Sequence, residues 1–208
     1  MEAILVYPAY FPAVIQMAAM VQAKSVVFEV HDNYQKQTYR NRAHIAHTNG
    51  LLSLNVPIKH AGGDGRQPTA EVQTETAFPW QKQHWKSLQS AYRTSPFFEF
   101  YEDELAPLFE EQAHGLQAHN IRIFESLCEL LDVEIDFSLS KEYEKQPAQQ
   151  DLRELIRAKR AKTYQLPAYH QVFGDRHGFL PNLSILDLLF NEGPNSLAYL
   201  QALDLSQL

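Results

Sequence analysis

The sequence predicts an α/β fold, with α+β as the alternative, and three features lead to this prediction. A strand pattern, a helix pattern and a second strand pattern follow one another within the first thirty residues, which is the order and size of a βαβ unit. An Asn-Gly dipeptide between two extended segments indicates a hairpin. Later segments carry apolar residues at the spacing of amphipathic helices. We therefore expect one domain over residues 1–208, with a small mixed sheet covered by helices.

The first strand, the helix and the second strand are predicted from their residue types. Residues 3–6 are apolar and lie just before Pro8, and proline cannot donate a hydrogen bond within a central sheet. Residues 13–24 are rich in helix formers, and Pro12 suits the start of that helix. Residues 25–30 are β-branched and aromatic, which favours a strand. A crossover of this kind is right-handed and joins parallel strands.

The remaining elements follow from local signals. A hairpin is expected over residues 39–57, with its turn at Thr48-Asn49-Gly50, because Asn and Gly tolerate positive φ. The glycine-rich stretch 61–67 is expected to form a loop. Helical patterns lie at residues 76–92, 116–131, 151–162 and 183–190.

Composition and charge exclude several classes of protein. The formal net charge of −7 argues against nonspecific binding to nucleic acid or to an anionic membrane surface. Cys128 is the single cysteine, so an internal disulfide and a cysteine-built zinc site within one chain are excluded. The longest apolar stretches fall short of the ~20 residues of a membrane-spanning helix, and the N-terminus does not resemble a signal peptide. We therefore expect a cytoplasmic protein that does not insert into membranes.

The acidic residues are concentrated in one part of the chain. Residues 97–136 contain eleven acidic residues and one basic residue, Arg122. We interpret this stretch as a solvated helical face rather than a metal site. An alternative is a homodimer, in which this acidic face contacts a basic segment of a neighbouring copy.

One segment concentrates basic and hydrogen-bonding side chains in this acidic chain. In an extended conformation its residues 36, 38, 40 and 42 would share a face. Guanidinium groups bind phosphate or carboxylate through paired hydrogen bonds, and lysine supplies a point charge, so the segment predicts a small anionic ligand. The alternative is an edge strand that uses charge to prevent sheet pairing. The candidate binding residues of the segment are Tyr34, Lys36, Arg40, Asn41 and Arg42.

The position of such a ligand is predicted by the expected sheet. Ligands of open parallel sheets bind outside the carboxyl ends of the strands. The turn at residues 7–12 and the segment after Val30 follow the two predicted strands. We therefore expect both to border one crevice, with Tyr10 among the binding residues.

His84 is the candidate catalytic residue. It lies one helical turn after Trp80 in the pattern PWQKQHW, and a histidine beside aromatic rings can act as a general base near neutral pH. A histidine on the helix surface or in the core is the alternative. Asp187 and Asn191 are one turn apart in an apolar run, where a carboxylate needs a partner, so we give them, with Trp80, a supporting role. No metal site is predicted, and no cofactor motif is present.

Several stretches together resemble the WbqC-like protein family of bacteria. The pattern VYPAYFP supplies the Pro-x-Tyr-x-Pro sequence of the family, with Tyr7 where glutamine is usual. Residues 34–36 resemble its Tyr-x-Lys step, and Asn41-Arg42 its Asn-Arg pair. The resemblance runs from about residue 4 to residue 200 and is completed by LNVPI, PWQKQHW, YRTSPFF and FLPNLSILDLLFNEGP.

The resemblance implies a role in surface-polysaccharide biosynthesis, because family members occur in gene clusters for O-antigen and related polysaccharides. We expect a transferase that acts on an activated sugar, by acyl or aminoacyl transfer to an amino sugar. The basic segment would then bind an anionic substrate such as a sugar nucleotide, and His84 would be the base. The alternative is a non-catalytic binding or assembly module that recognises an anionic glycan or an acidic protein partner.

Overall fold

A four-stranded parallel sheet lies at the centre of the protein, whose computed structural model describes residues 2–59, 66–159 and 162–208. All three neighbouring pairs of strands are parallel, so the four carboxyl ends lie at one edge. The strands lie in the order β5 (Phe137–Leu139), β2 (Ser25–Phe28), β1 (Ala3–Val6) and β6 (Gln150–Asp151). Helix α1 (Val14–Gln22) joins β1 to β2, as the βαβ pattern predicts.

The α/β class is confirmed, but the strands belong to two sheets. Strands β3 (Arg42–His47) and β4 (Gly50–Asn55) form a separate antiparallel pair rather than part of one mixed sheet. Their tight turn is the predicted one, and Gly50 adopts a φ of +98°, which favours glycine. The Ser184 N–H donates to the His44 carbonyl at 2.7 Å, which attaches the hairpin to the C-terminal part of the chain.

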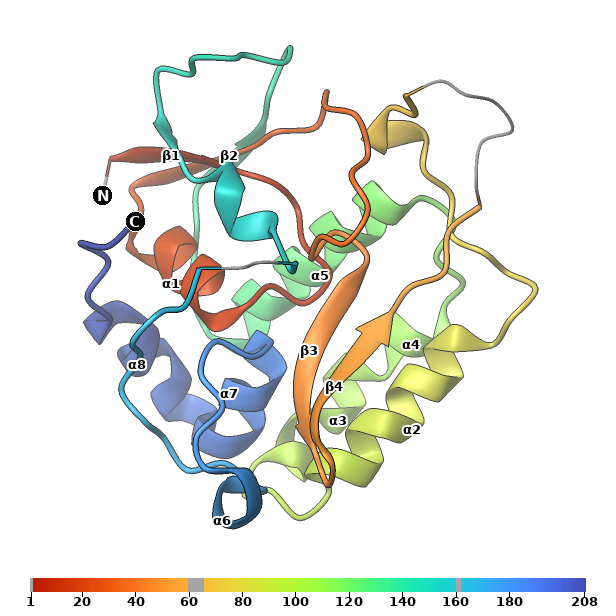
Figure 1. Cartoon of the computed structure of the whole chain (residues 1–208), viewed down its shortest axis with the longest axis vertical. Coiled ribbons are helices and arrows are strands. Elements are labelled where there is room, and N and C mark those ends of the chain that lie inside the picture. Colours follow the sequence, from red (N-terminus) through yellow and green to blue (C-terminus); the bar gives the residue numbers. More distant parts are fainter. Residues whose placement is uncertain (1, 60–65, 160–161) are drawn as a thin grey trace.

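Helices pack against one face of the parallel sheet, and β1 and β2 lie above α1 and α5 in Figure 1. Phe124 on α5 (Leu116–Leu130) packs edge-on against Phe28 and Phe137 of the strands. The other helices are α2 (Trp80–Tyr92), α3 (Phe98–Leu105), α4 (Pro107–Glu110), α6 (Gly174–His177), α7 (Ile185–Glu192) and α8 (Ser196–Ala202), with 3-10 turns at Thr69–Glu71, Arg153–Ile156 and Gly193–Asn195. No helix in the described ranges is long and apolar enough to cross a membrane.

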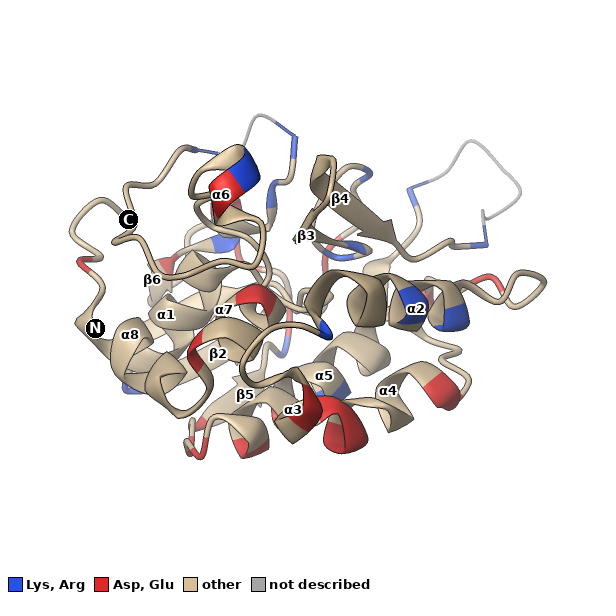
Figure 2. Ribbon diagram, turned by 90° about the horizontal axis from the view of Figure 1, so that it is seen from below, with Lys and Arg blue, Asp and Glu red and all other residues tan. Residues whose placement is uncertain are grey.

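The acidic stretch forms a solvated face, as predicted. Ten of its eleven acidic residues are exposed, and Glu102 is partly buried. Figure 2 shows Asp and Glu concentrated along α3 and α4. The charges therefore lie in water, where they need no partner in the core.

The opposite face of the parallel sheet is crossed by a loop instead of a helix. Side chains alternate along a strand, and the strand register places Leu5, Val27, Ser138 and Asp151 on this face. The connection from β5 to β6, residues 140–149, runs over it and lies above the strands in Figure 1. Parallel sheets are usually covered by helices on both faces, so a loop here leaves room for hollows.

Besides α1, three of the predicted helices are confirmed, as α2, α5 and α7. The helix predicted at 151–162 is wrong, because within the described part of that range the helical turn is Arg153–Ile156. The next residues run alongside another segment: the N–H groups of Ala158 and Lys159 donate to the Gln37 carbonyl at 3.3 and 3.2 Å. The loop predicted at 61–67 lies largely outside the described residues.

Candidate functional site

The basic segment folds as a turn, and this buries Arg40. Gln37 has a φ of +62°, which breaks the alternation of faces expected for an extended segment. The Arg40 side chain is 1% exposed, and its Nη2 donates to the Asp32 carboxylate at 2.5 Å. Its guanidinium carbon lies 3.9 Å from the centroid of the Tyr7 ring. Arg40 thus connects the segments that follow β1 and β2, and solvent does not reach it.

The other residues of the segment lie in different environments. The Asn41 side chain donates to the Val56 carbonyl at 2.9 Å, so it holds the hairpin. Burial raises the pKa of the half-buried Tyr34. Arg42 is partly exposed at the start of β3, whereas Lys36 is exposed. Of the predicted binding residues in this segment, Lys36 is the one with an exposed side chain.

His84 lies in a buried aromatic cluster with Tyr10 and Trp80. The Tyr10 hydroxyl is 2.9 Å from Nδ1 of His84, and Nε2 is 3.2 Å from the Asn55 carbonyl oxygen. The hydroxyl therefore donates to Nδ1, and Nε2–H donates to the carbonyl. Burial lowers the pKa of His84 to about 4. Both ring nitrogens are thus engaged inside the protein, and the role of His84 as a base stays a prediction that this geometry does not favour.

Asp187 lies in a separate buried cluster and is 0% exposed. Its carboxylate accepts hydrogen bonds from the Tyr92 hydroxyl, the Tyr169 hydroxyl and the Gln171 amide, each at 2.7 Å. Burial raises the pKa of the carboxyl group, and the three donors oppose that shift. The Asn191 amide donates to the Asp187 main-chain carbonyl at 2.7 Å. These contacts tie α2 and residues 169–171 to α7, which suits a supporting role.

A hollow of about 370 Å³ lies at the carboxyl end of β6, the strand that pairs with β1, and is lined by Asp151 and by residues that follow it. The chain leaves β1 toward β2 on one side, whereas β6 lies on the other side of β1. This is a topological switch point, where open parallel sheets bind their ligands. Two phenols, Tyr39 and Tyr164, line the hollow together with Leu152 and Leu155. The remaining lining residues are Asp151, Glu154, Arg157, Lys162, Asn182 and Leu208.

Tyr39 is backed by an imidazole. Its hydroxyl lies 3.3 Å from Nδ1 of His44, and the two rings meet edge to face. Burial raises the pKa of Tyr39, and burial and the Arg42 charge lower the pKa of His44. Both groups are therefore neutral at neutral pH, and the hydroxyl donates to the imidazole. A phenol that lines a hollow and contacts an imidazole can relay a proton.

A second hollow, of about 420 Å³, adjoins the first through Arg157, which lines both. Lys36, Arg157 and Lys159, here called the basic strip, line it together with Gln35, Gln37 and Thr38. No carboxylate is among the described residues that line it. Arg157 pairs with Glu154 at 2.8 Å, and both side chains are more than half exposed. Exposed ion pairs are weak, so a ligand anion can replace Glu154 as the partner of Arg157.

Sequence reasoning found Lys36 but did not assign Tyr39, His44, Arg157 or Lys159 to the site. The bridge between Thr38 and Arg157 and the hydrogen bond from the Tyr39 N–H to the Ile156 carbonyl bring the two segments together. A pattern of neighbouring residues in the sequence does not predict backbone pairing between segments that lie far apart along the chain. In the described ranges, no three His, Cys, Asp or Glu side chains are grouped as a metal site.

Comparisons with known proteins agree with the resemblance seen in the sequence. The chain matches the WbqC-like protein family over residues 7–168 and 159–199. It is 28% identical over 206 residues to the Uncharacterized protein Rv1507c of Mycobacterium tuberculosis, an alignment that covers 84% of this chain and 87% of that protein. No solved structure shows a significant match. With a match across most of its length, the chain belongs to the WbqC-like protein family.

Proposed function

We propose that this protein binds a phosphorylated small molecule, and that a sugar nucleotide is the class that fits best. The observation that carries the proposal is that Arg157 lines two unlike hollows. One combines two phenols and three leucines with charged side chains of both signs, and the other is lined by the three cations of the basic strip. Tyr39 and Tyr164 would contact the sugar or the base through their rings. The basic strip would neutralise the phosphates.

We further propose that the bound molecule reacts, and that the protein is a cytoplasmic transferase of surface-polysaccharide biosynthesis. In acyl or aminoacyl transfer, a bond forms between the amine nitrogen of the sugar and the acyl carbon of an activated ester or thioester. The bond from that carbon to the leaving group breaks, and the leaving group keeps the electron pair. The amine proton passes to the Tyr39 oxygen while the hydroxyl proton moves to Nδ1 of His44. The 3.3 Å contact between Tyr39 and His44 supports this relay.

Ligand-induced stabilisation tests the binding step. A ligand that binds the folded state raises the unfolding temperature by mass action, so we would screen a panel of sugar nucleotides by thermal shift. We expect at least one to stabilise the wild type and to lose this effect when the basic strip is replaced by Lys36→Ala, Arg157→Ala and Lys159→Ala together. Lys82→Ala, an exposed cation on α2, is the matched control and should keep the shift. No shift with any member of the panel would contradict the proposal.

The variant Tyr39→Phe tests the reaction separately from binding. It keeps the ring against the hollow and removes the hydroxyl, so we expect the affinity to stay within about twofold while turnover falls by about 100-fold or more. Turnover would be measured as acyl transfer to the sugar nucleotide found in the screen. Wild-type turnover in Tyr39→Phe would contradict the relay. Binding without transfer from any acyl donor would favour the non-catalytic module instead.

A further inference from the structure

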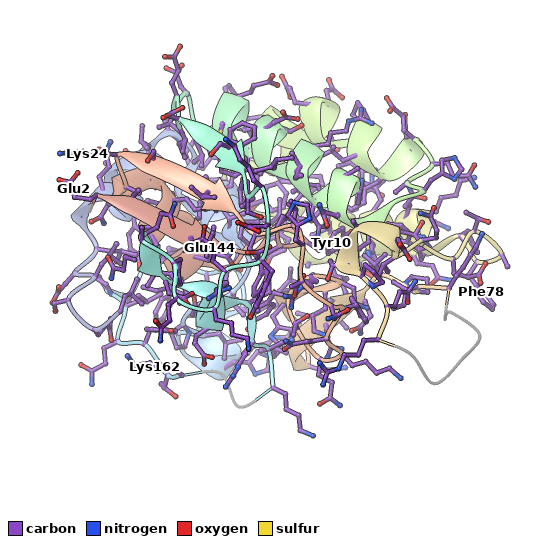
Figure 3. All side chains as sticks on the ribbon, turned by 90° about the horizontal axis from the view of Figure 1, so that it is seen from above. Glu2, Tyr10, Lys24, Phe78, Glu144 and Lys162 are labelled. Atoms are coloured by element: carbon purple, nitrogen blue, oxygen red, sulfur yellow. The ribbon has the colours of Figure 1, made fainter. Side chains whose placement is uncertain are left out.

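The open face of the parallel sheet holds a third hollow, of about 280 Å³. Leu5 and Val27 form its strand side, and residues of the 140–149 connection form the other side. In Figure 3 this connection, marked by Glu144, runs in front of the strands. The hollow is separate from the one beside Tyr39, because the two share no lining residue among those described.

Glu29 lines this hollow and is 1% exposed. Its Oε1 accepts hydrogen bonds from the His31 N–H at 2.7 Å and from the Ser140 hydroxyl at 3.0 Å. Its Oε2 has no hydrogen-bond partner within the described part of the chain. A buried carboxylate oxygen that lacks a donor is unfavourable, so a ligand donor that enters the hollow and reaches this oxygen would satisfy it.

Arg153 is the cation beside Glu29, but its donors are engaged elsewhere. Its Nη1 is 4.0 Å from Glu29 Oε2, beyond hydrogen-bond distance. The same Nη1 donates to the Glu144 carbonyl at 2.8 Å. Nε and Nη2 donate to the two oxygens of Asp151 at 2.8 and 2.6 Å. Arg153 is therefore held in place by Asp151 and Glu144, and its long ion pair with Glu29 leaves Oε2 without a hydrogen bond.

The lining of the hollow suits a cation with an apolar body. Three acidic residues, Glu29, Glu142 and Glu144, line it against one lysine, Lys141. Apolar side chains of the strands and of the connection supply the rest of its surface: Leu5, Val27, Leu139 and Pro147. Pockets for drug-sized ligands measure about 300–1,000 Å³, so this hollow, which is slightly smaller, suits a molecule smaller than a drug.

We infer that this hollow binds a small primary amine, whose ammonium group donates to Glu29 Oε2 and whose carbon skeleton packs on Leu5 and Val27. A charge-assisted hydrogen bond to a buried carboxylate is stronger than one between neutral groups. The site needs neither the sugar nucleotide nor the transfer reaction, so it stands independently of the proposed function.

A matched pair of probes tests the charge requirement. Cyclohexylamine and cyclohexanol have the same ring and differ in the ammonium group. We would titrate each into the wild-type protein at neutral pH and follow the backbone amides by NMR. Cyclohexylamine is expected to shift Val27, Glu29 and Ser140 and to bind at least about tenfold more tightly than cyclohexanol. Equal affinities, or shifts confined to other regions, would overturn the inference.

Two variants test the position of the site. Glu29→Gln keeps an acceptor for His31 and Ser140 but removes the charge, and the affinity for cyclohexylamine should fall by at least about tenfold. Glu110→Gln, an exposed carboxylate on α4, should bind as the wild type does. Val27→Phe fills the hollow and keeps Glu29, so it should abolish cyclohexylamine binding. If Glu29→Gln fails to fold, Val27→Phe alone tests whether the amine binds in this hollow. Wild-type affinity in either folded variant would overturn the site.

Discussion

Two arginines near the carboxyl edge of the sheet differ in what surrounds them. Arg40 is 1% exposed and is held between Asp32 and the Tyr7 ring. The Arg157 side chain is 59% exposed, faces two hollows and has a surface carboxylate, Glu154, as its partner. Arg40 belongs to the segment that looks most like a ligand site in the sequence. Burial and a buried partner keep Arg40 from any ligand, whereas Arg157 is exposed and its partner can be replaced.

Removal of Arg40 should have the largest effect on stability. Arg40→Ala leaves the Asp32 carboxylate buried without its cation, and breaking a buried ion pair in this way costs about 3–5 kcal/mol of unfolding free energy. Urea denaturation measures the loss. Arg157→Ala is the matched control and should change stability by about 0.5 kcal/mol or less. Similar losses of unfolding free energy in the two variants would contradict the difference in burial between Arg40 and Arg157.

Two buried histidines, His84 and His119, should make the stability of the protein depend on pH. Burial lowers the pKa of His84 and of His119 to about 4, from the ordinary histidine value of about 6.5. Because the unfolded chain takes up protons first, stability should be lost as pH falls from 6.5 toward 4, by up to about 3 kcal/mol per histidine. Urea denaturation across this range measures the slope, and His84→Gln should reduce it. An unchanged slope in that variant would mean that His84 is not held neutral by the fold.

Asp187→Asn should have a smaller effect on stability. The new amide group faces one of the donors Tyr92, Tyr169 and Gln171, so one buried hydrogen bond is lost at a cost of about 2 kcal/mol. Urea denaturation measures this loss, and thermal shift with the sugar nucleotide checks that binding persists. Loss of binding in the folded variant would place Asp187 in the site rather than in its support.

The smallest expected effect is on affinity. Lys36→Ala removes one exposed cation of the basic strip and should weaken sugar-nucleotide binding by about threefold to tenfold, without changing the unfolding free energy. Calorimetric titration measures the affinity. Added salt should reduce the difference in affinity between the variant and the wild type, because exposed charges are screened. An affinity equal to that of the wild type would remove Lys36 from the site.

The elements predicted from the sequence are those with strong local signals. Residues 3–28 carry the strand, helix and strand in their residue types, and Gly50 marks the hairpin turn. Strand β6 is two residues long, which is too short for any periodic pattern. Within residues 151–159 the helix formers build the 3-10 turn Arg153–Ile156 instead of an α-helix, and the residues after it pair with residues 37–39.

The candidate site was predictable only in part, because its residues come together through contacts between distant segments. Tyr10 and His84 do meet, but through a hydrogen bond inside the core that sequence spacing does not distinguish from a catalytic contact. Tyr39 and Arg157 come together through backbone pairing of distant segments. Arg157 is exposed and Arg40 is buried in the folded chain, whereas the sequence gives both residues the same charge.

A titration of isotope-labelled protein with inorganic pyrophosphate, followed by backbone-amide NMR, tests the basic strip most directly. Pyrophosphate carries the charge of a nucleotide diphosphate without its sugar or base. If the basic strip binds phosphate, the shifts concentrate at residues 36–39 and 157–159 and disappear in the triple alanine variant. Shifts centred elsewhere, or shifts that persist in that variant, would contradict the assignment of the site.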